Sequence, residues 1–327
     1  MILQTSFSAL LVGLNYNNPD YLNYELAFNN AYGRLTEFDL FNVLDIGTKS
    51  ILLVGNEIGI NNYGDFRLIY SIILFFIFGI TIRKTCKYGA ICLTLYMVSY
   101  IFLDEVQFRN FSSFVILLPF LIYYIKNQNK KGLIIFLIGD FLAFTLHFSA
   151  VFYLLFGLTI VKSKSLKITY IAIAILFIGA ISAIESNIAM IDHTSHYEAP
   201  SIVGGVVSCF LLVCNYWFIN YINNNYLLKK KDVCSLSIYK YFHIIVQINL
   251  LLLILCPVIF INATILRILR FISIVNIIFI LNLATDHNKR KISNKLICYS
   301  LIYSLIIGYW FNRSTGVYES IFNNPLF

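Results

Sequence analysis

The stretch FRLIYSIILFFIFGITI, residues 66–82, is followed directly by the basic run RKTCK, residues 83–87. An apolar stretch of about 17 to 25 residues is long enough to cross the hydrocarbon core of a bilayer as a helix. Lys and Arg concentrate in the cytoplasmic loops of membrane proteins. The first run therefore predicts a membrane-spanning helix, and the second predicts the side on which that helix ends.

The composition of the whole chain indicates the same class of protein. Of the 327 residues, 59% are hydrophobic and 12% are charged, and the mean hydropathy is +0.78. A soluble globular protein usually carries about 25% charged residues. We therefore predict an all-α, polytopic integral-membrane helical bundle that forms a single domain over residues 1–327.

Further apolar runs are spaced along the chain like spans. The candidates are 1–14, 66–82, 88–103, 111–125, 132–146, 149–161, 168–184, 202–222, 242–261, 264–284 and 296–311. They predict about 10 or 11 membrane segments. The first run is short, so we expect it to be the end of a longer helix, and it lacks the features of a cleavable signal peptide. Two polar stretches remain, 15–65 and 185–201, and the first is a long loop after the first short span.

The basic residues divide the loops into two alternating sets. Every second loop is basic, and these loops hold 17 of the 24 Lys and Arg residues: 83–87, 126–131, 162–167, 223–241 and 285–295. The remaining segments should therefore face outward: 15–65, 104–110, the turn at His147, 185–201, 262–264 and the tail after 311. The alternation also explains the net charge of +8, so we read the lysine clusters as topology signals and expect no nucleic-acid partner.

Seven basic residues lie outside the basic loops: Arg34, Lys49, Arg67, Arg109, Arg267, Arg270 and Arg313. We expect the first three to snorkel toward lipid headgroups or to pair with outer acids. Ionisable residues inside spans are costly and usually face a cavity or a partner. Arginine can hold phosphate or carboxylate with two donors at once.

Arg109 begins a predicted span beside Asp104 and Glu105, and Arg267 and Arg270 are three residues apart on one helix face. If the three arginines gather at one face of the membrane, they predict an anionic ligand such as a lipid-linked phosphate. The alternative is that they, too, snorkel or pair with acids.

His147 lies among apolar residues in FLAFTLHFSAVFYLL, residues 141–155. It is either a structural histidine bonded to a neighbouring helix or a general base, since imidazole titrates near neutral pH. The stretch DHTSHYEAP, residues 192–200, has two further histidines, but their spacing matches no closed zinc motif, so we expect a solvated loop and no metal. The seven cysteines include no CxxC pair, and we read them as small apolar residues.

Six short segments follow one another along nearly the whole chain: LNYNNPDYLNYE (14–25), GNEIGINNY (55–63), FRNFSSF (108–114), LHFSAVFYLL (146–155), LRILRF (266–271) and YESIF (318–322). Taken together, they resemble the motifs of the EpsG/Wzy-like family of bacterial exopolysaccharide and O-antigen polymerases. The first segment resembles that family's Gly-x-Arg-Tyr stretch followed by Asp-Tyr-x-x-Tyr, and the fourth resembles its Phe-His-x-Ser-Ala element. Three positions depart from the pattern, with Asn15 in place of Arg, Asn110 in place of Gln and Leu146 in place of Phe.

The resemblance implies a multi-span, metal-independent glycosyltransferase that needs no cofactor. Such an enzyme joins oligosaccharide units carried on undecaprenyl pyrophosphate at the outer face of the bacterial inner membrane, during exopolysaccharide, capsule or O-antigen synthesis. The implied partners are the lipid-linked oligosaccharide, membrane lipid, a chain-length regulator and a flippase. The residues that match family motifs or adjoin them are Asp20, Tyr21, Tyr24, Glu25, Arg109, His147, Arg267 and Arg270, and Tyr197 is a further candidate for sugar binding.

In this hypothesis Arg109, Arg267 and Arg270 hold the pyrophosphate of the donor. His147, or an outer carboxylate such as Asp20 or Glu25, deprotonates the acceptor hydroxyl, and the tyrosine-rich loop stacks on sugar rings. A flippase for lipid-linked glycans is one alternative, although it would favour charges deep within spans and repeated or broken helices. A ligase-type transferase with similar arginines and a membrane acyltransferase are the others.

Overall fold

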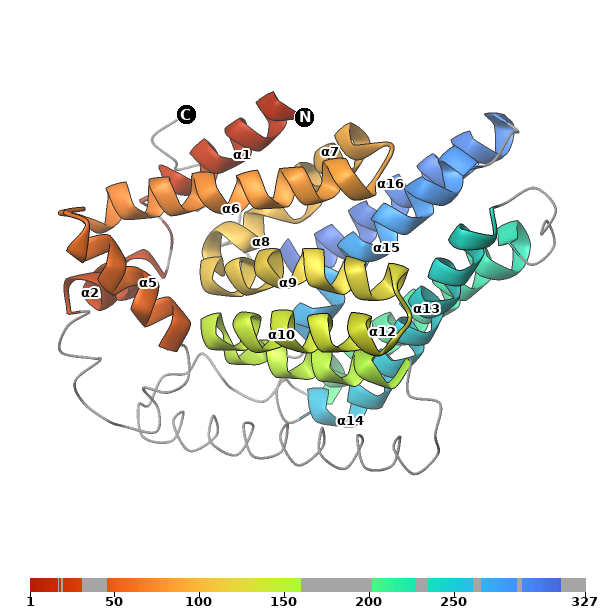
Figure 1. Cartoon of the computed structure of the whole chain (residues 1–327). Coiled ribbons are helices and arrows are strands. Elements are labelled where there is room, and N and C mark those ends of the chain that lie inside the picture. The colour runs from red at the N-terminus through yellow and green to blue at the C-terminus, as the bar shows by residue number, and fades with distance from the viewer. Residues whose placement is uncertain are drawn as a thin grey trace. The chain divides into compact units, whose positions relative to one another are not determined.

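The computed structural model describes residues 1–16, 18, 20–30, 46–159, 202–227, 235–260, 266–286 and 290–312. Within these ranges all the regular structure is helical (Figure 1). Six of the described helices are long and apolar enough to cross a membrane: α6 (Tyr63–Thr85), α9 (Phe108–Lys126), α12 with the π-turn η3 (Ile202–Leu227), α13 with the 3-10 turn η5 (Leu236–Leu255), α15 (Leu266–Asp286) and α16 (Arg290–Asn312). The chain is thus a multi-pass helical membrane protein, as the sequence predicts.

Shorter elements complete the described chain: α1 (Ile2–Gly13), α2 (Tyr21–Asn29), α5 (Ile46–Glu57), α7 (Gly89–Ser99), α8 (Ile101–Val106), α10 (Lys130–Leu146), the 3-10 helix η1 (Phe148–Thr159) and α14 (Cys256–Ile259). The predicted span 88–103 is divided at Tyr100 into α7 and α8. The polar stretch 15–65, which the sequence indicates as a loop, contains the two short helices α2 and α5. The predicted span 168–184 lies outside the described residues.

By its internal contacts the chain falls into two compact units. The first comprises Met1–Pro119, Leu142–Phe148 and Lys295–Phe327, and the second comprises Phe120–Phe141 and Ser149–Asn294. The candidate site residues Tyr24, Arg109 and His147 therefore belong to the first unit, and Arg270 belongs to the second. That the two units fold as a single domain stays a prediction.

Local signals set where α5 ends and α6 begins. Gly59 has φ +88°, a conformation that side-chain-bearing L-residues rarely adopt, and the N–H of Ile60 donates to the carbonyl of Gly55 at 3.1 Å. These are features of a glycine C-cap. Asn62 then caps α6, because its side chain accepts a hydrogen bond from the N–H of Asp65 at 2.8 Å. The chain therefore reverses within a few residues, and α6 starts next to the end of α5.

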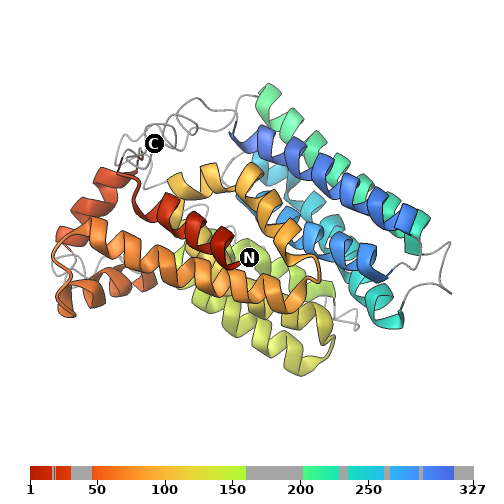
Figure 2. The same ribbon diagram turned by 90° about the horizontal axis from the view of Figure 1, so that it is seen from above.

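Helices α1 and α6 pack antiparallel and side by side in the first unit (Figures 1 and 2). Near the end of α1, Gly13 lies against Leu68, and near its beginning, Thr5 lies against Gly79. A Cβ atom on Gly79 would come within 2.7 Å of Thr5 Oγ1. Small residues let membrane helices approach closely, because packing rather than the hydrophobic effect holds such helices together in lipid.

Segments that the charge pattern assigns to one side lie at one end of the first unit. The Asn18 side chain donates to the carbonyl of Glu105 at 2.6 Å, and the Thr48 hydroxyl donates to the carbonyl of Leu146 at 2.7 Å. These bonds join the stretch 15–65 to the segment 104–110 and to the turn at His147. At the beginning of α1, Met1 instead contacts Gly89, which follows the basic loop 83–87. Which end faces outward stays a prediction.

Three buried asparagines connect helices of the second unit. Asn215 Nδ2 of α12 donates to Asn249 Oδ1 of α13 at 2.6 Å, and Asn249 Nδ2 donates to Asn276 Oδ1 of α15 at 2.8 Å. Asn276 Nδ2 closes the set by donating to Asn215 Oδ1 at 3.3 Å. Each of the three is at most 3% exposed. Amide groups hydrogen-bond across membrane helices in this way, so this amide ring holds α12, α13 and α15 in one register.

We expect Asn249→Leu to lower the free energy of unfolding by about 1–2 kcal/mol, because the middle member of the amide ring bonds to both of the others. Thermal or denaturant unfolding of the purified protein in detergent measures the change. Asn224→Leu is the matched control, since Asn224 is exposed in the π-turn after α12. Equal unfolding free energies for the Asn249 variant and the wild type would contradict a stabilising role of the ring.

Candidate functional site

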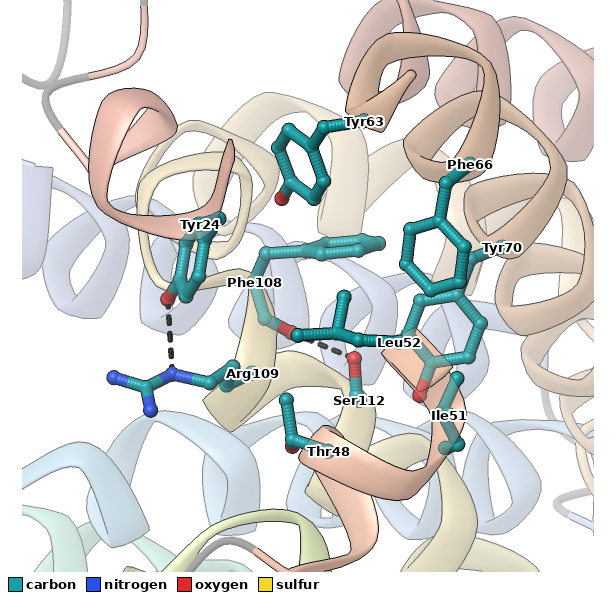
Figure 3. Close-up of a pocket in the computed structure, with 10 residues that line it drawn as sticks. All are labelled: Tyr24, Thr48, Ile51, Leu52, Tyr63, Phe66, Tyr70, Phe108, Arg109 and Ser112. Atoms are coloured by element: carbon teal, nitrogen blue, oxygen red, sulfur yellow. Dashed lines mark hydrogen bonds between the residues drawn. The ribbon is translucent and has the colours of Figure 1, made fainter. Parts of the chain in front are cut away.

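A pocket in the first unit lies among α2, α5, α6 and α9 (Figure 3). It is lined by Tyr24, Thr48, Ile51, Leu52, Tyr63, Phe66, Tyr70, Phe108, Arg109 and Ser112. Half of these residues are aromatic. The cavity volume is about 20 Å³, which leaves room for about one water molecule. The pocket therefore admits a hydroxyl group or the edge of a ring, and a larger ligand would lie across its mouth.

Arg109 stands at the edge of this pocket, in the first turn of α9. Its Nε donates to the hydroxyl oxygen of Tyr24 at 3.3 Å, and its Cζ lies 5.2 Å from the centroid of the Tyr24 ring. Figure 3 shows the terminal nitrogens of the guanidinium directed away from the aromatic wall. The hydrogen bond and the cation–π contact with one tyrosine fix the orientation of the arginine.

The aromatic wall continues from the pocket into α2. The rings of Tyr21 and Tyr63 meet edge to face with centroids 5.0 Å apart, and those of Tyr24 and Tyr63 lie 6.2 Å apart. Burial, together with the charge of Glu25, raises the pKa of Tyr21 to about 12. At neutral pH the Tyr21 hydroxyl is thus protonated, so it can donate a hydrogen bond to a ligand.

The two carboxylates predicted for the site also lie on or beside α2. Asp20 immediately precedes the helix, and its backbone N–H donates to Asn18 Oδ1 at 2.7 Å. Glu25 is one turn further along and near enough to Tyr21 to act on its pKa. Both side chains are half-buried. The structure therefore brings both acids to the helix that also supplies Tyr24 to Arg109.

His147 lies at the same end of the first unit as Arg109. Helices α9 and α10 run antiparallel, and the Ser113 hydroxyl of α9 donates to the carbonyl of Ala143 in α10 at 2.9 Å. Thr48, which lines the pocket, bonds to the carbonyl of the residue just before His147. His147 itself is 5% exposed, and its ring centroid lies 4.6 Å from that of Phe148. The histidine is thus tied to the pocket through the backbone of α10.

Helix α5 can approach α10 closely because residue 47 is glycine. A Cβ atom there would lie 2.5 Å from Thr145 Oγ1 and 2.8 Å from the Thr145 carbonyl oxygen. We expect Gly47→Val to lower the free energy of unfolding by about 1–3 kcal/mol through overpacking and to break the bond between Thr48 and Leu146. Ser50→Val, at an exposed position of α5, is the control. Melting temperatures in detergent compare the two, and equal values would contradict this packing requirement.

Arg67 is a part of the site that sequence reasoning left unassigned. It is fully buried, and its Nη2 forms a salt bridge of 2.8 Å with Oε1 of Glu105, which is also fully buried. Asn18 Nδ2 donates to the same carboxylate oxygen at 2.8 Å. Snorkelling is therefore the wrong interpretation for Arg67, and pairing with an acid is confirmed. The available signal was an arginine at the start of the predicted span 66–82 and a glutamate in the segment 104–110, which was expected to face outward as the start of that span does.

Arg267 and Arg270 lie in the first turns of α15 in the second unit. Arg270 is fully buried, with its Cζ 4.6 Å from the centroid of the Phe271 ring, and Arg267 is half-buried. Because Arg109 belongs to the other unit, the grouping of the three arginines into one anion site stays a prediction. Tyr197 and the histidines of the stretch 192–200 lie outside the described residues.

Together, these observations define a multi-pass helical membrane protein with an arginine held by a tyrosine at the mouth of an aromatic pocket. The chain belongs to the EpsG family, whose family model matches residues 1–323. It is accordingly a polysaccharide-polymerase-like membrane protein, and the resemblance seen in its motifs is confirmed. Searches of curated proteins and of solved structures find no match to this chain.

Proposed function

We propose that this protein polymerises oligosaccharide repeat units that are carried on undecaprenyl pyrophosphate, at the outer face of the bacterial inner membrane. The observation that carries the proposal is the contact of Arg109 with Tyr24 at the mouth of an aromatic pocket. A guanidinium can bind phosphate oxygens through two parallel hydrogen bonds. Tyrosine rings offer both an apolar face and a hydroxyl to a ligand. A sugar linked to pyrophosphate combines the two chemistries that such a site would recognise.

The proposed reaction is a displacement at the anomeric carbon of the donor sugar. The bond from C1 to the pyrophosphate oxygen breaks, and C1 forms a new bond to a hydroxyl oxygen of the acceptor glycan. The departing pyrophosphate keeps the electron pair of the broken bond, and the charge of Arg109 stabilises it as it leaves. Attack from the opposite side inverts the configuration at C1. The donor is already activated by its pyrophosphate leaving group.

The acceptor hydroxyl loses its proton to a base, for which His147 is the proposed residue. Imidazole titrates near neutral pH, so a histidine can take up a proton under working conditions. The packing of α10 against the pocket through Thr48 supports this choice. Asp20, just before α2, and Glu25, within α2, are the alternative bases, and Arg267 and Arg270 are proposed as further anion contacts.

The test is reconstitution of the purified protein in lipid vesicles with synthetic lipid-linked repeat units. We expect products with two or more repeats, and one undecaprenyl pyrophosphate released for every glycosidic bond formed. Gel electrophoresis and mass spectrometry measure both quantities. Chain growth without release of the carrier, or no growth from a well-folded protein, would contradict the proposal.

A deletion strain distinguishes the polymerase from its competitors. Loss of a polymerase should leave single repeat units on lipid at the outer leaflet. Loss of a flippase should leave them at the inner leaflet. Loss of a ligase should leave full-length chains on the lipid carrier. Leaflet location can be read from the accessibility of the glycan to an impermeant lectin.

A further inference from the structure

The guanidinium of Arg67 contacts aromatic rings from two helices of the candidate site, α2 and α9. Its Cζ lies 5.7 Å from the ring centroid of Tyr21 and 5.5 Å from that of Phe108. Tyr21 belongs to α2, the helix that supplies Tyr24. Phe108 lines the pocket and immediately precedes Arg109. One buried cation thus touches the residue adjacent to Arg109 and also the helix that holds Arg109 in place.

Hydrogen bonds to α1 and to α8 fix the position of Arg67. Its Nε donates to the carbonyl of Val12 at the end of α1, at 3.0 Å. Its Nη2 donates to both the carbonyl and Oε1 of Glu105 in α8, at 3.1 and 2.8 Å. Asn18 donates to the same two oxygens at 2.6 and 2.8 Å. We call Arg67, Glu105 and Asn18 the Arg67 network; it joins α1, α6, α8 and the segment that leads into α2.

Stability alone is a weak reason for such a network. Burying two charges costs desolvation that their attraction barely offsets, and apolar pairs of similar volume often hold a fold equally well. Buried ion pairs can instead specify one geometry among several. In this protein the specified geometry is the placement of α2 against the junction between α8 and α9, which is where Tyr24 meets Arg109.

We propose that the Arg67 network is a positioning device that sets Arg109 and Tyr24 for their contact with the anionic part of the substrate. The proposal rests on the proposed function, because it assigns to the network the alignment of the arginine that binds pyrophosphate. Arg67 itself is buried at 0% exposure, so it acts through Tyr21 and Phe108 and not by touching the ligand.

The first test replaces the ion pair by two apolar side chains, Arg67→Met with Glu105→Met, in the full-length protein. Both charges of the pair are removed together, so neither is left without the other, and we expect a folded protein whose melting temperature is close to that of the wild type. Hydrogen–deuterium exchange of α2 and of residues 103–109 should rise at least about tenfold, and exchange in α12 and α15 should not change. Arg83→Met is the matched control, since Arg83 is exposed at the other end of α6.

The second test asks whether the network acts through Arg109, by a double-mutant cycle. In the wild-type background, Arg67→Met together with Glu105→Met should lower the turnover of lipid-linked repeat units at least about 30-fold. In an Arg109→Lys background, which keeps the charge but not the paired donors, the same change should cost less than about threefold. A merely structural role would give equal losses in the two backgrounds. Arg67→Lys keeps the charge beside Glu105, so its turnover should lie between that of the wild type and that of the double variant Arg67→Met with Glu105→Met.

The outcomes separate failure of the inference from failure of the proposed function. Unchanged exchange in α2 and at residues 103–109 overturns the positioning role, whatever the reaction proves to be. Equal losses of turnover in both backgrounds also overturn it. If the wild-type protein forms no polymer, the proposed function fails, and the exchange result then decides the inference by itself. Raised exchange confined to α2 and residues 103–109 supports the network as the device that positions Arg109 and Tyr24.

Discussion

Arg109→Ala is expected to lower polymer formation in reconstituted vesicles about 100-fold or more, with the protein still folded. Removing one group that stabilises a developing negative charge typically costs about 10² to 10³ in rate. Arg109 is half-buried, and the contact that it loses is a long hydrogen bond and a cation–π pair with Tyr24. Such contacts contribute about 0.5–1 kcal/mol at a partly exposed site, so the effect on folding should be small.

Two further variants separate the charge of Arg109 from its geometry. Arg109→Lys keeps the charge without the fork of paired donors and should lose about tenfold. Tyr24→Phe keeps the ring below the guanidinium and removes only the hydroxyl acceptor, so its loss should be smaller still. Wild-type chain lengths from Arg109→Ala at normal expression would exclude this arginine from the reaction.

His147→Gln is expected to lower turnover about 10²-fold or more and to flatten the pH dependence of the reaction. General bases contribute about 10² to 10⁴ in rate. A base works in its unprotonated form, so the wild-type rate should rise as the pH increases through the titration of the imidazole. Glutamine has a similar size and does not titrate near neutral pH, so the acid limb of the profile should disappear in the variant. Initial rates between pH 5 and 8 measure this.

The alternative bases provide the comparison for His147. Asp20→Asn and Glu25→Gln should keep the acid limb of the wild-type profile if His147 is the base. Leu142→Ala, at an exposed position of the same helix, controls for disturbance of α10. A profile that keeps its acid limb in His147→Gln and loses it in one of the two carboxylate variants would move the role of base to that carboxylate.

The membrane helices could be predicted from the sequence because apolar length is a local property. The predicted span 66–82 falls within α6, and the predicted span 111–125 falls within α9. The described part of the predicted span 264–284 falls within α15. Helices α2 and α5 could not be predicted in this way, because short helices depend on tertiary contacts. The Asn56 side chain of α5, for example, donates to the carbonyl of Phe28 in α2 at 2.9 Å.

The candidate site was predictable only in part. The motifs indicated Tyr24 and Arg109, which the structure places in contact. The pairing of Arg67 with Glu105 joins residues 38 positions apart. A sequence displays charges but not the packing that brings two of them together, so it leaves both alternatives open for Arg67, snorkelling and pairing with an acid. Arg267, Arg270 and Tyr197 remain predictions, because the first two lie in the other unit and Tyr197 lies outside the described residues.

The amide ring of Asn215, Asn249 and Asn276 has a consequence for the conditions under which the protein can work. Side-chain amides carry no ionisable proton in the physiological pH range and no net charge. Acidification of the surroundings therefore cannot weaken these bonds, and the membrane potential exerts no net force on them, as it does on an ionised side chain. Helices α12, α13 and α15 should keep their register in an acid-stressed or de-energised cell, in which helices joined by titrating groups would loosen.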